Sequence, residues 1–309
     1  MSKAAPALRS PACGLPIIRA ELSGSPSTVA LAEWKLYCVG ILQVEEKAVL
    51  PTQASSVQVS PSHGNAAAVA CSPSLSIVIP AYNERERLTL SLPAIDAYLR
   101  ATGLDAEILV VDDGSTDATA ELAVSLAFGR EQRVISLPVN QGKGAAVRCG
   151  VLAAHGDWVL VSDADLSTPI DEYDRLAAIA RADNLDVVIG SRALPGSRVE
   201  VSQHIVRRVL GEVFNIILRR VTGLPYRDTQ CGFKLLRRSR VEAVFAEMVI
   251  DGFAFDVEFL YLCERRSLRV KEVPVTWRNS PQSTVSIIGS PPKMLFDLMR
   301  LWWRFRNRG

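Results

Sequence analysis

No run of about 18 consecutive apolar residues occurs in this chain, although 48% of its 309 residues are hydrophobic. A helix that spans a bilayer needs roughly that length of apolar sequence. The uncharged stretch from Ala48 to Asn83 is long, but Pro, Ser, Gln and Asn interrupt it throughout. The sequence therefore predicts no transmembrane helix, and its apolar residues are enough to fill one large core or two modest ones.

Cysteine pairs with disulfide or metal-site spacing are also lacking. The six cysteines are far apart, with no C-x-x-C and no histidine near them at metal-ligand spacing: Cys13, Cys38, Cys71, Cys149, Cys231 and Cys263. This usage is typical of reduced thiols in a cytosolic protein, and it excludes a small disulfide-stapled scaffold.

A secretory signal is absent from the first 74 residues, which hold seven of the 17 prolines and little sustained periodicity. We interpret residues 1–74 as a mostly disordered extension. The regular pattern begins at Leu75, so we expect one folded domain over 75–290 and a basic amphipathic helix over 291–309.

A strong net charge is lacking too, since the balance is only +2, but the charge is unevenly placed. Residues 205–240 hold nine lysines or arginines and two acids, and residues 290–309 hold five against one. Both stretches also carry large apolar residues, which favours a phosphate group or a membrane surface as partner. Nucleic acid is not expected, because stacking aromatics are not interleaved with the basic residues.

Strands and helices alternate over residues 75–190. Strands are expected over 75–80, 107–112, 133–137, 157–161 and 186–190, with helices over 86–102, 115–128, 143–155 and 170–181. This alternation predicts an α/β fold with a mainly parallel sheet, helices on both faces and ligands at the carboxyl ends of the strands. Further helices are expected over 201–220, near 241, over 253–265 and in the tail, with a strand over 270–277.

Two carboxylates, Asp163 and Asp165, follow directly after the apolar run 157–161. Alternate residues of an extended chain point the same way, so the two side chains can converge just past the strand. Such a pair suits Mg²⁺ or Mn²⁺, which takes further ligands from substrate phosphates. The alternative is an Asp-rich turn that caps a helix beginning near Thr168-Pro169.

Four loops should meet at the edge where these aspartates lie: 80–84, 112–117, 140–144 and 163–165. They supply an aromatic ring with a carboxylate, an acidic pair, a Gly-Lys-Gly loop compatible with phosphate, and the metal ligands. Together they suit a nucleotide diphosphate held through Mg²⁺. Neither a Walker loop nor G-x-G-x-x-G is present.

Three motifs in this order resemble glycosyltransferase family 2, the inverting enzymes of the Rossmann-like GT-A fold: Ser76–Glu84, Val111–Asp117 and Asp163–Pro169. Within the family, Asn140–Val147, Gly190–Arg192, Arg227–Leu236 and Gly252–Glu258 resemble the branch of dolichyl-phosphate β-glucosyltransferases. The resemblance covers roughly residues 75–309. It implies UDP-glucose as donor and a polyprenyl phosphate as acceptor. It further implies nucleoside contacts by Pro80, Tyr82, Glu84, Asp112 and Asp113, Lys143 near the diphosphate, and Asp163 with Asp165 on the metal.

The basic residues independently favour a phosphate acceptor. A hydroxyl nucleophile needs a general base, whereas a phosphate monoester is already ionised near neutral pH and needs cations instead. The candidate cations are Arg192, Arg207, Arg208 and Lys234, and the candidate bases for a hydroxyl acceptor are Asp228 and Asp256. Asp165 and Arg192 then serve as catalytic residues in an in-line displacement at the sugar C1.

Several alternatives stay open at this point. The donor could be GDP-mannose, the acceptor could be a glycan hydroxyl, or the protein could be a nucleotide-sugar-binding scaffold without activity. The tail, with Trp302-Trp303 among arginines, fits an interfacial helix at the cytoplasmic face of a membrane, or else a helix that packs its aromatic stripe on the domain.

Overall fold

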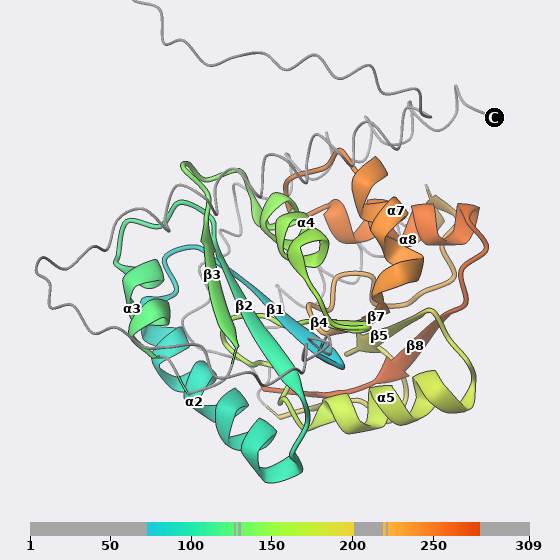
Figure 1. Ribbon diagram of the computed structural model, residues 1–309. Helices are drawn as coiled ribbons and strands as arrows, with labels where there is room; N and C mark the ends of the chain where they lie inside the picture. Colours follow the sequence, from blue (N-terminus) through green and yellow to red (C-terminus); the bar gives the residue numbers. More distant parts are fainter. Residues whose placement is uncertain (1–72, 127, 129–130, 201–218, 221, 279–309) are drawn as a thin grey trace, which may run out of the picture.

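The computed structural model describes residues 73–126, 128, 131–200, 219–220 and 222–278. Its strands are β1 (Leu75–Ala81), β2 (Ala106–Asp112), β3 (Gln132–Ser136), β4 (Trp158–Val161), β5 (Val187–Ser191), β6 (Arg198–Val199), β7 (Lys234–Arg237), β8 (Val270–Pro274) and β9 (Thr276–Trp277). Its helices are α2 (Arg85–Thr102), α3 (Thr119–Ser125), α4 (Lys143–Ala153), α5 (Glu172–Ala182), α7 (Arg238–Glu247) and α8 (Phe255–Arg265) (Figure 1). Every element expected between residues 75 and 190 is present.

Seven strands form the main sheet in the order β3-β2-β1-β4-β7-β5-β8. All neighbouring pairs are parallel except those of β7, which runs antiparallel to β4 and to β5. The mainly parallel α/β sheet is therefore confirmed. Because β7 runs the opposite way, its first residue, Lys234, pairs with Val161 at the end of β4.

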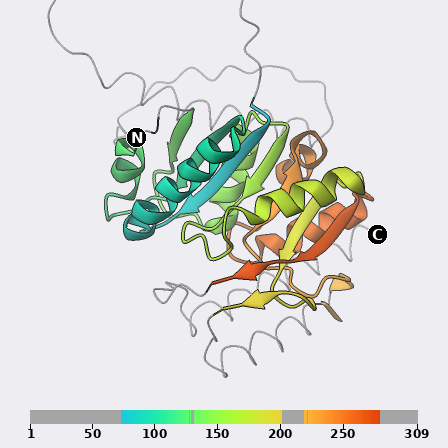
Figure 2. The ribbon, with the colours of Figure 1, turned by 90° about the horizontal axis from the view of Figure 1, so that it is seen from below.

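Helices cover both faces of the sheet (Figures 1 and 2). α2 and α5 bury their apolar sides with Ile77, Ile79 and Leu160 on one face. α4, α7 and α8 pack on the other face, around Val78 and Val159. Every residue of β1, β2 and β5 is buried, which explains why these strands are mostly apolar rather than alternating between apolar and polar residues.

Two helix starts differ from expectation. α3 begins at Thr119, after Ala118 at φ 61°, rather than at Ser115 or Thr116. Those two residues are bonded to Asn83: the Asn83 N–H donates to Ser115 Oγ, and the Thr116 N–H donates to Asn83 Oδ1, both at 2.9 Å. α5 begins at Glu172 without a side-chain cap, so the 163–169 segment is not the cap of that helix.

Several expected elements lie outside the described residues. Of the helix expected over 201–220, only residues 219 and 220 are described, and both are helical. The extension over 1–72 and the tail helix over 291–309 are also outside. Among the helices that the structure does describe, none is both long enough and apolar enough to cross a bilayer.

Candidate active site

The carboxyl ends of β1, β2, β4 and β5 all lie at one edge of the main sheet. The residues that follow these strands are Tyr82–Glu84, Asp113, Asp163–Asp165 and Arg192, and β7 begins at this edge with Lys234. Gln141 and Gly142 reach the same edge, because their N–H groups donate to Asp113. The meeting of the four expected loops is therefore confirmed.

The loop after β1 presents an aromatic ring and a carboxylate. Pro80 is buried within β1, whereas Tyr82 is 43% exposed. Both carboxylate oxygens of Glu84 lie 2.7 Å from Nη1 of Arg87. Burial raises the pKa of Glu84 against the opposing effect of Arg87, and the nearby charges of Asp165 and Asp163 raise it further. Glu84 thus belongs to the same electrostatic cluster as the two aspartates after β4.

The acidic pair at the end of β2 organises the neighbouring loops. Asp113 is buried and accepts the N–H groups of Gln141 and Gly142 at 2.7 and 2.8 Å. Burial raises the pKa of Asp113, although these two N–H donors oppose the rise. Asp112 accepts the Ser115 N–H at 3.2 Å. Both side chains are thus already engaged within the protein.

The Gly-Lys-Gly loop uses several of its backbone N–H groups within the protein. Its Gly142 N–H donates to Asp113, and the N–H groups of Gly144 and Ala145 donate to the Asp251 carbonyl at 2.7 and 3.2 Å. Gly142 has φ 111°, and a Cβ there would lie 2.4 Å from the Asp251 oxygen, so glycine is required by close backbone approach. What the loop offers to a ligand is the Lys143 side chain.

Lys143 forms an ion pair with Asp163. Its Nζ lies 2.6 Å from Oδ1, with 21% of the lysine side chain and 38% of the aspartate side chain exposed. Burial alone would raise the pKa of Asp163, but the charges of Lys143, Lys234 and Arg192 lower it overall. The carboxylate also lies against Gly232, where a Cβ would come within 2.1 Å of Oδ2 and 2.4 Å of Oδ1.

Asp165 lies in a tight turn with Asp163. The Leu166 N–H donates to the Asp163 carbonyl at 3.2 Å, and Leu166 has φ 46°. The Ser167 N–H donates to Asp165 Oδ1 at 2.9 Å. The turn that the sequence posed as the alternative is therefore present, and both carboxylates belong to it.

Arg192, the first residue after β5, is bound to Asp228. Its Nε and Nη2 donate to Oδ2 and Oδ1 at 2.7 and 2.9 Å, and its backbone N–H donates to Oδ2 at 2.9 Å. The guanidinium also lies 5.7 Å from the ring centroid of Trp277. Burial would raise the pKa of Asp228, but Arg192 lowers it overall. Asp228 is therefore an ionised partner of arginine and a weak proton acceptor.

Lys234 is in the interior rather than at the surface. Only 3% of its side chain is exposed, and Nζ donates to the Cys231 carbonyl and to Asp256 Oδ1, the latter at 2.5 Å. Burial raises the pKa of Asp256, although Lys234 and Lys143 oppose the rise. The expected contact between Lys234 and an acceptor phosphate does not agree with this position, since the ammonium is turned to Asp256.

Residues 76–245 match the family model described as glycosyl transferase family 2. The chain belongs to glycosyltransferase family 2. A dolichyl-phosphate beta-glucosyltransferase of Trichomonas vaginalis is 36% identical over 241 residues, covering 75% of this chain and 71% of that protein. The Homo sapiens dolichyl-phosphate beta-glucosyltransferase is 31% identical over 244 residues, covering 75% of each chain.

The fold of this glycosyltransferase is GT-A. Glucosyl-3-phosphoglycerate synthase of Mycobacterium tuberculosis, in complex with Mn²⁺, UDP and glucosyl-3-phosphoglycerate, matches with a TM-score of 0.56. The match covers 74% of this chain and 80% of that chain at 19% identity. At that identity the likeness establishes the fold alone.

The side chains available as metal ligands in this site are of the kind that a hard divalent cation prefers. Asp163 and Asp165 supply carboxylate oxygens from one turn, and no sulfur or imidazole ligand accompanies them in the described part of the site. Oxygen ligands of this kind suit Mg²⁺ or Mn²⁺, which complete their shell with water and phosphate. Oδ1 of Asp163 is paired with Lys143, and a Cβ at Gly232 would meet both carboxylate oxygens.

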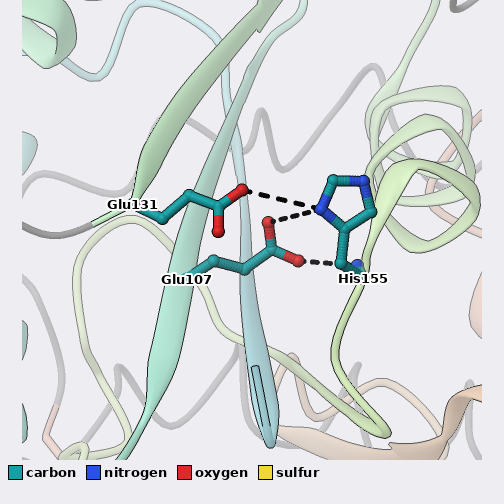
Figure 3. A group of neighbouring side chains, drawn as sticks. All are labelled: Glu107, Glu131 and His155. Atoms are coloured by element: carbon teal, nitrogen blue, oxygen red, sulfur yellow. Dashed lines mark hydrogen bonds and ion pairs between the residues drawn. The ribbon is translucent and has the colours of Figure 1, made fainter. Parts of the chain in front are cut away.

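A second group of possible metal ligands lies elsewhere in the glycosyltransferase (Figure 3). Glu107, Glu131 and His155 lie near the amino ends of β2, β3 and β4, at the edge opposite the active site. Both oxygens of Glu107 are already engaged by the Ser76 hydroxyl, the His155 N–H and the Arg133 guanidinium. The arginine neutralises Glu107, so this group is structural.

A groove of about 630 Å³ beside Asp165 was not foreseen from the sequence. One side is formed by α2, with Arg87, Leu90 and Ala94, and the other by residues 165–166 and 169–171 and by Arg278. Its lining comes from segments far apart in sequence, so no local motif predicts it.

Two of the expected phosphate ligands, Arg207 and Arg208, lie outside the described residues.

Proposed function

We propose that this protein transfers glucose from UDP-glucose to a polyprenyl phosphate of the dolichyl type, with inversion, giving polyprenyl β-glucosyl phosphate and UDP. The names of its curated relatives support glucose and a dolichyl phosphate acceptor. UDP-glucose as donor is part of this proposal; the glucosyl-3-phosphoglycerate synthase that shares the fold has been solved with Mn²⁺ and UDP-glucose.

The observation that supports a phosphate acceptor is that both candidate bases are already paired with cations of the protein. Asp228 is held by two side-chain donors of Arg192, and Asp256 by Lys234. A hydroxyl acceptor needs a free base within hydrogen-bond reach. A phosphate monoester, with a second pKa of about 6, is already a nucleophile at neutral pH. The site is therefore better suited to an ionised acceptor than to a sugar hydroxyl.

Arg192 is the cation that we propose for the acceptor phosphate. Its side chain is 32% exposed, and its contacts with Asp228 use Nε and Nη2. Nη1 has no partner among the described residues, so its N–H donors can meet a phosphate oxygen. Asp228 and the Trp277 ring orient the guanidinium for that contact. We assign Lys234 and Asp256 to holding this part of the site in place.

Asp163 and Asp165 would hold Mg²⁺ or Mn²⁺, and the bound cation would supply charge neutralisation on the departing diphosphate. Lys143, at the start of α4, adds a second positive charge on the same side. Tyr82 offers an exposed ring to the nucleoside, and Glu84 follows two residues later in the same loop. We propose that Pro80, which is buried in β1, and the hydrogen-bonded carboxylates of Asp112 and Asp113 shape the nucleoside pocket.

The acceptor lipid requires the protein to work at a membrane surface. We propose peripheral attachment on the cytoplasmic face through residues 291–309, which carry basic and aromatic residues. Co-sedimentation with vesicles containing anionic lipid, for the full chain and for a variant with Trp302 and Trp303 both changed to Ser, tests this attachment. Equal binding of the two proteins would contradict it.

The decisive experiment measures transfer from radiolabelled UDP-glucose and, in parallel, GDP-mannose to polyprenyl phosphate, with Mg²⁺, Mn²⁺ or excess chelator. We expect lipid-linked glucose that disappears with chelator. Transfer from GDP-mannose alone would overturn the donor. No lipid product from either donor, with sugar transfer to a glycan instead, would overturn the acceptor, and no transfer at all would leave a nucleotide-sugar-binding scaffold.

A further inference from the structure

One side of the Asp163 carboxylate lies against Gly232, and one of its oxygens is paired with a lysine. A Cβ at Gly232 would come within 2.1 Å of Oδ2 and within 2.4 Å of both Oδ1 and the carboxylate carbon, so Gly232 closes that side of the group. Oδ1 lies 2.6 Å from the ammonium of Lys143. A cation that approaches Asp163 through Oδ1 therefore meets a positive charge that is already in place.

The base of Lys143 is fixed, whereas its ammonium has room to move. The flanking N–H groups of Gly142 and Gly144 are bonded to Asp113 and Asp251, which anchors the first turn of α4. The side chain is 21% exposed, and four flexible methylenes separate the ammonium from this anchored backbone. The negative charges of Asp256 and Asp165 also act on the ammonium.

We propose that Lys143 is a built-in counter-ion of Asp163, which competes with a divalent cation for this carboxylate and which a nucleotide diphosphate draws away. The inference rests on the proposed function, because it takes Asp163 as a metal ligand. Lys143 competes with the cation when no nucleotide is bound. When a diphosphate binds, the ammonium transfers to its oxygens and Oδ1 of Asp163 becomes available to the cation.

This exchange makes cation and diphosphate binding cooperative beyond their direct contact. A cation that binds alone must leave Lys143 without its partner, whereas a cation that binds with the diphosphate does not. By linkage, whatever factor the diphosphate contributes to cation affinity, the cation contributes to diphosphate affinity. Replacing Lys143 with an uncharged residue should strengthen binding of the cation alone and weaken this cooperativity.

The experiment measures Mn²⁺ binding by electron paramagnetic resonance of free Mn²⁺, with and without UDP, for the wild type, Lys143→Met and Lys143→Arg. We expect Lys143→Met to bind Mn²⁺ alone about tenfold more tightly, the ratio that ~1.4 kcal/mol produces. UDP should then increase its Mn²⁺ affinity by a smaller factor than in the wild type. Lys143→Arg keeps the charge and should resemble the wild type.

Lys271→Met is the matched control, because Lys271 forms an ion pair of the same 2.6 Å length with Asp183 on the far side of α5. It should leave Mn²⁺ affinity unchanged. Equal or weaker Mn²⁺ binding by Lys143→Met overturns the counter-ion role, and so does the absence of Mn²⁺ binding in all variants. The proposed transfer reaction can fail separately, since these measurements need neither sugar nor lipid.

Discussion

Arg192 and Asp228 form an ion pair with three hydrogen bonds, two from the guanidinium and one from the arginine's own backbone N–H. The backbone at Asp228 is itself fixed, because Glu272 of β8 accepts the N–H groups of Arg227 and Asp228 at 2.9 and 2.7 Å. The position of the guanidinium is thus set by three segments of the chain rather than by one loop.

Arg192→Lys should not preserve function, because a lysine cannot make the forked contact with Asp228 and still offer a planar edge to a phosphate. Hydrogen bonds to charged groups contribute about 1.5–3 kcal/mol each, so the KM for polyprenyl phosphate should rise by about ten- to a hundredfold. The dissociation constant for UDP should change little. Initial-rate kinetics with each substrate varied separately tests this, and a loss confined to UDP binding would put Arg192 on the donor side.

Asp165→Asn should leave the protein folded while lowering turnover by about a hundredfold or more, since metal charge stabilisation is worth several kcal/mol. Folding is retained because an asparagine Oδ1 can still accept the Ser167 N–H. The measurement is kcat with saturating Mg²⁺ or Mn²⁺, alongside the thermal midpoint. Asp171→Asn, in the loop before α5, is the control, and near-normal turnover of Asp165→Asn would remove the metal assignment.

Gly232→Ala should abolish cation binding by displacing Asp163, because the added Cβ would lie 2.1 Å from Oδ2. Mn²⁺ affinity and turnover should fall together. Gly103→Ala is the informative comparison. There the Cβ meets nothing within 4 Å, but φ is +65°, so the substitution should cost about 1–2 kcal/mol of stability and leave Mn²⁺ affinity intact. Normal Mn²⁺ binding by Gly232→Ala would mean that Asp163 does not contact the metal.

Glu107→Gln should reduce the loss of stability in acid. The pKa of Glu107 is lowered in the folded protein: burial alone would raise it, but bonds from Ser76, His155 and Arg133 outweigh burial. A lowered pKa stabilises the fold above the unfolded value of about 4.3, and this stability is lost as pH falls toward the folded value. Glu107→Gln should therefore lower stability at pH 7 by about 2 kcal/mol and flatten its fall below pH 5.

Thermal midpoints from pH 7 to pH 3 test this prediction, with Glu121→Gln on the exposed face of α3 as the control. A pH profile for Glu107→Gln parallel to that of the wild type would show that Glu107 does not carry the linkage.

The parts of the fold that follow from local pattern were predictable, and those that depend on distant pairing were not. Apolar runs ended by Pro80, Asp112 and Asp163 mark strands, and the edge where they meet follows from parallel pairing. The position of β7 between β4 and β5 could not be predicted, because the sequence of Lys234–Arg237 has no feature that identifies the strands it pairs with.

In the site, the residue types were predictable and their partners were not. Lys143 and Asp163 are 20 residues apart, and Arg192 and Asp228 are 36 apart, so only the folded chain brings each pair together. Lys234 did carry a signal that was missed. It lies between Phe233 and Leu235, both buried, and a charged residue within such a run belongs to the interior with a counter-charge rather than to the surface.

The central position of β7 also governs how the chain can be assembled during synthesis. The first four strands, β1 to β4, can pair as soon as Val161 has been made, but β5 has no place in the sheet until residues 234–237 are available to lie beside β4. Until then the free edge of β4, which leads to Asp163, remains open to pairing with other chains. A ribosome that stalls before Arg237 therefore leaves an aggregation-prone half-sheet, and an active fragment that ends before β7 cannot exist.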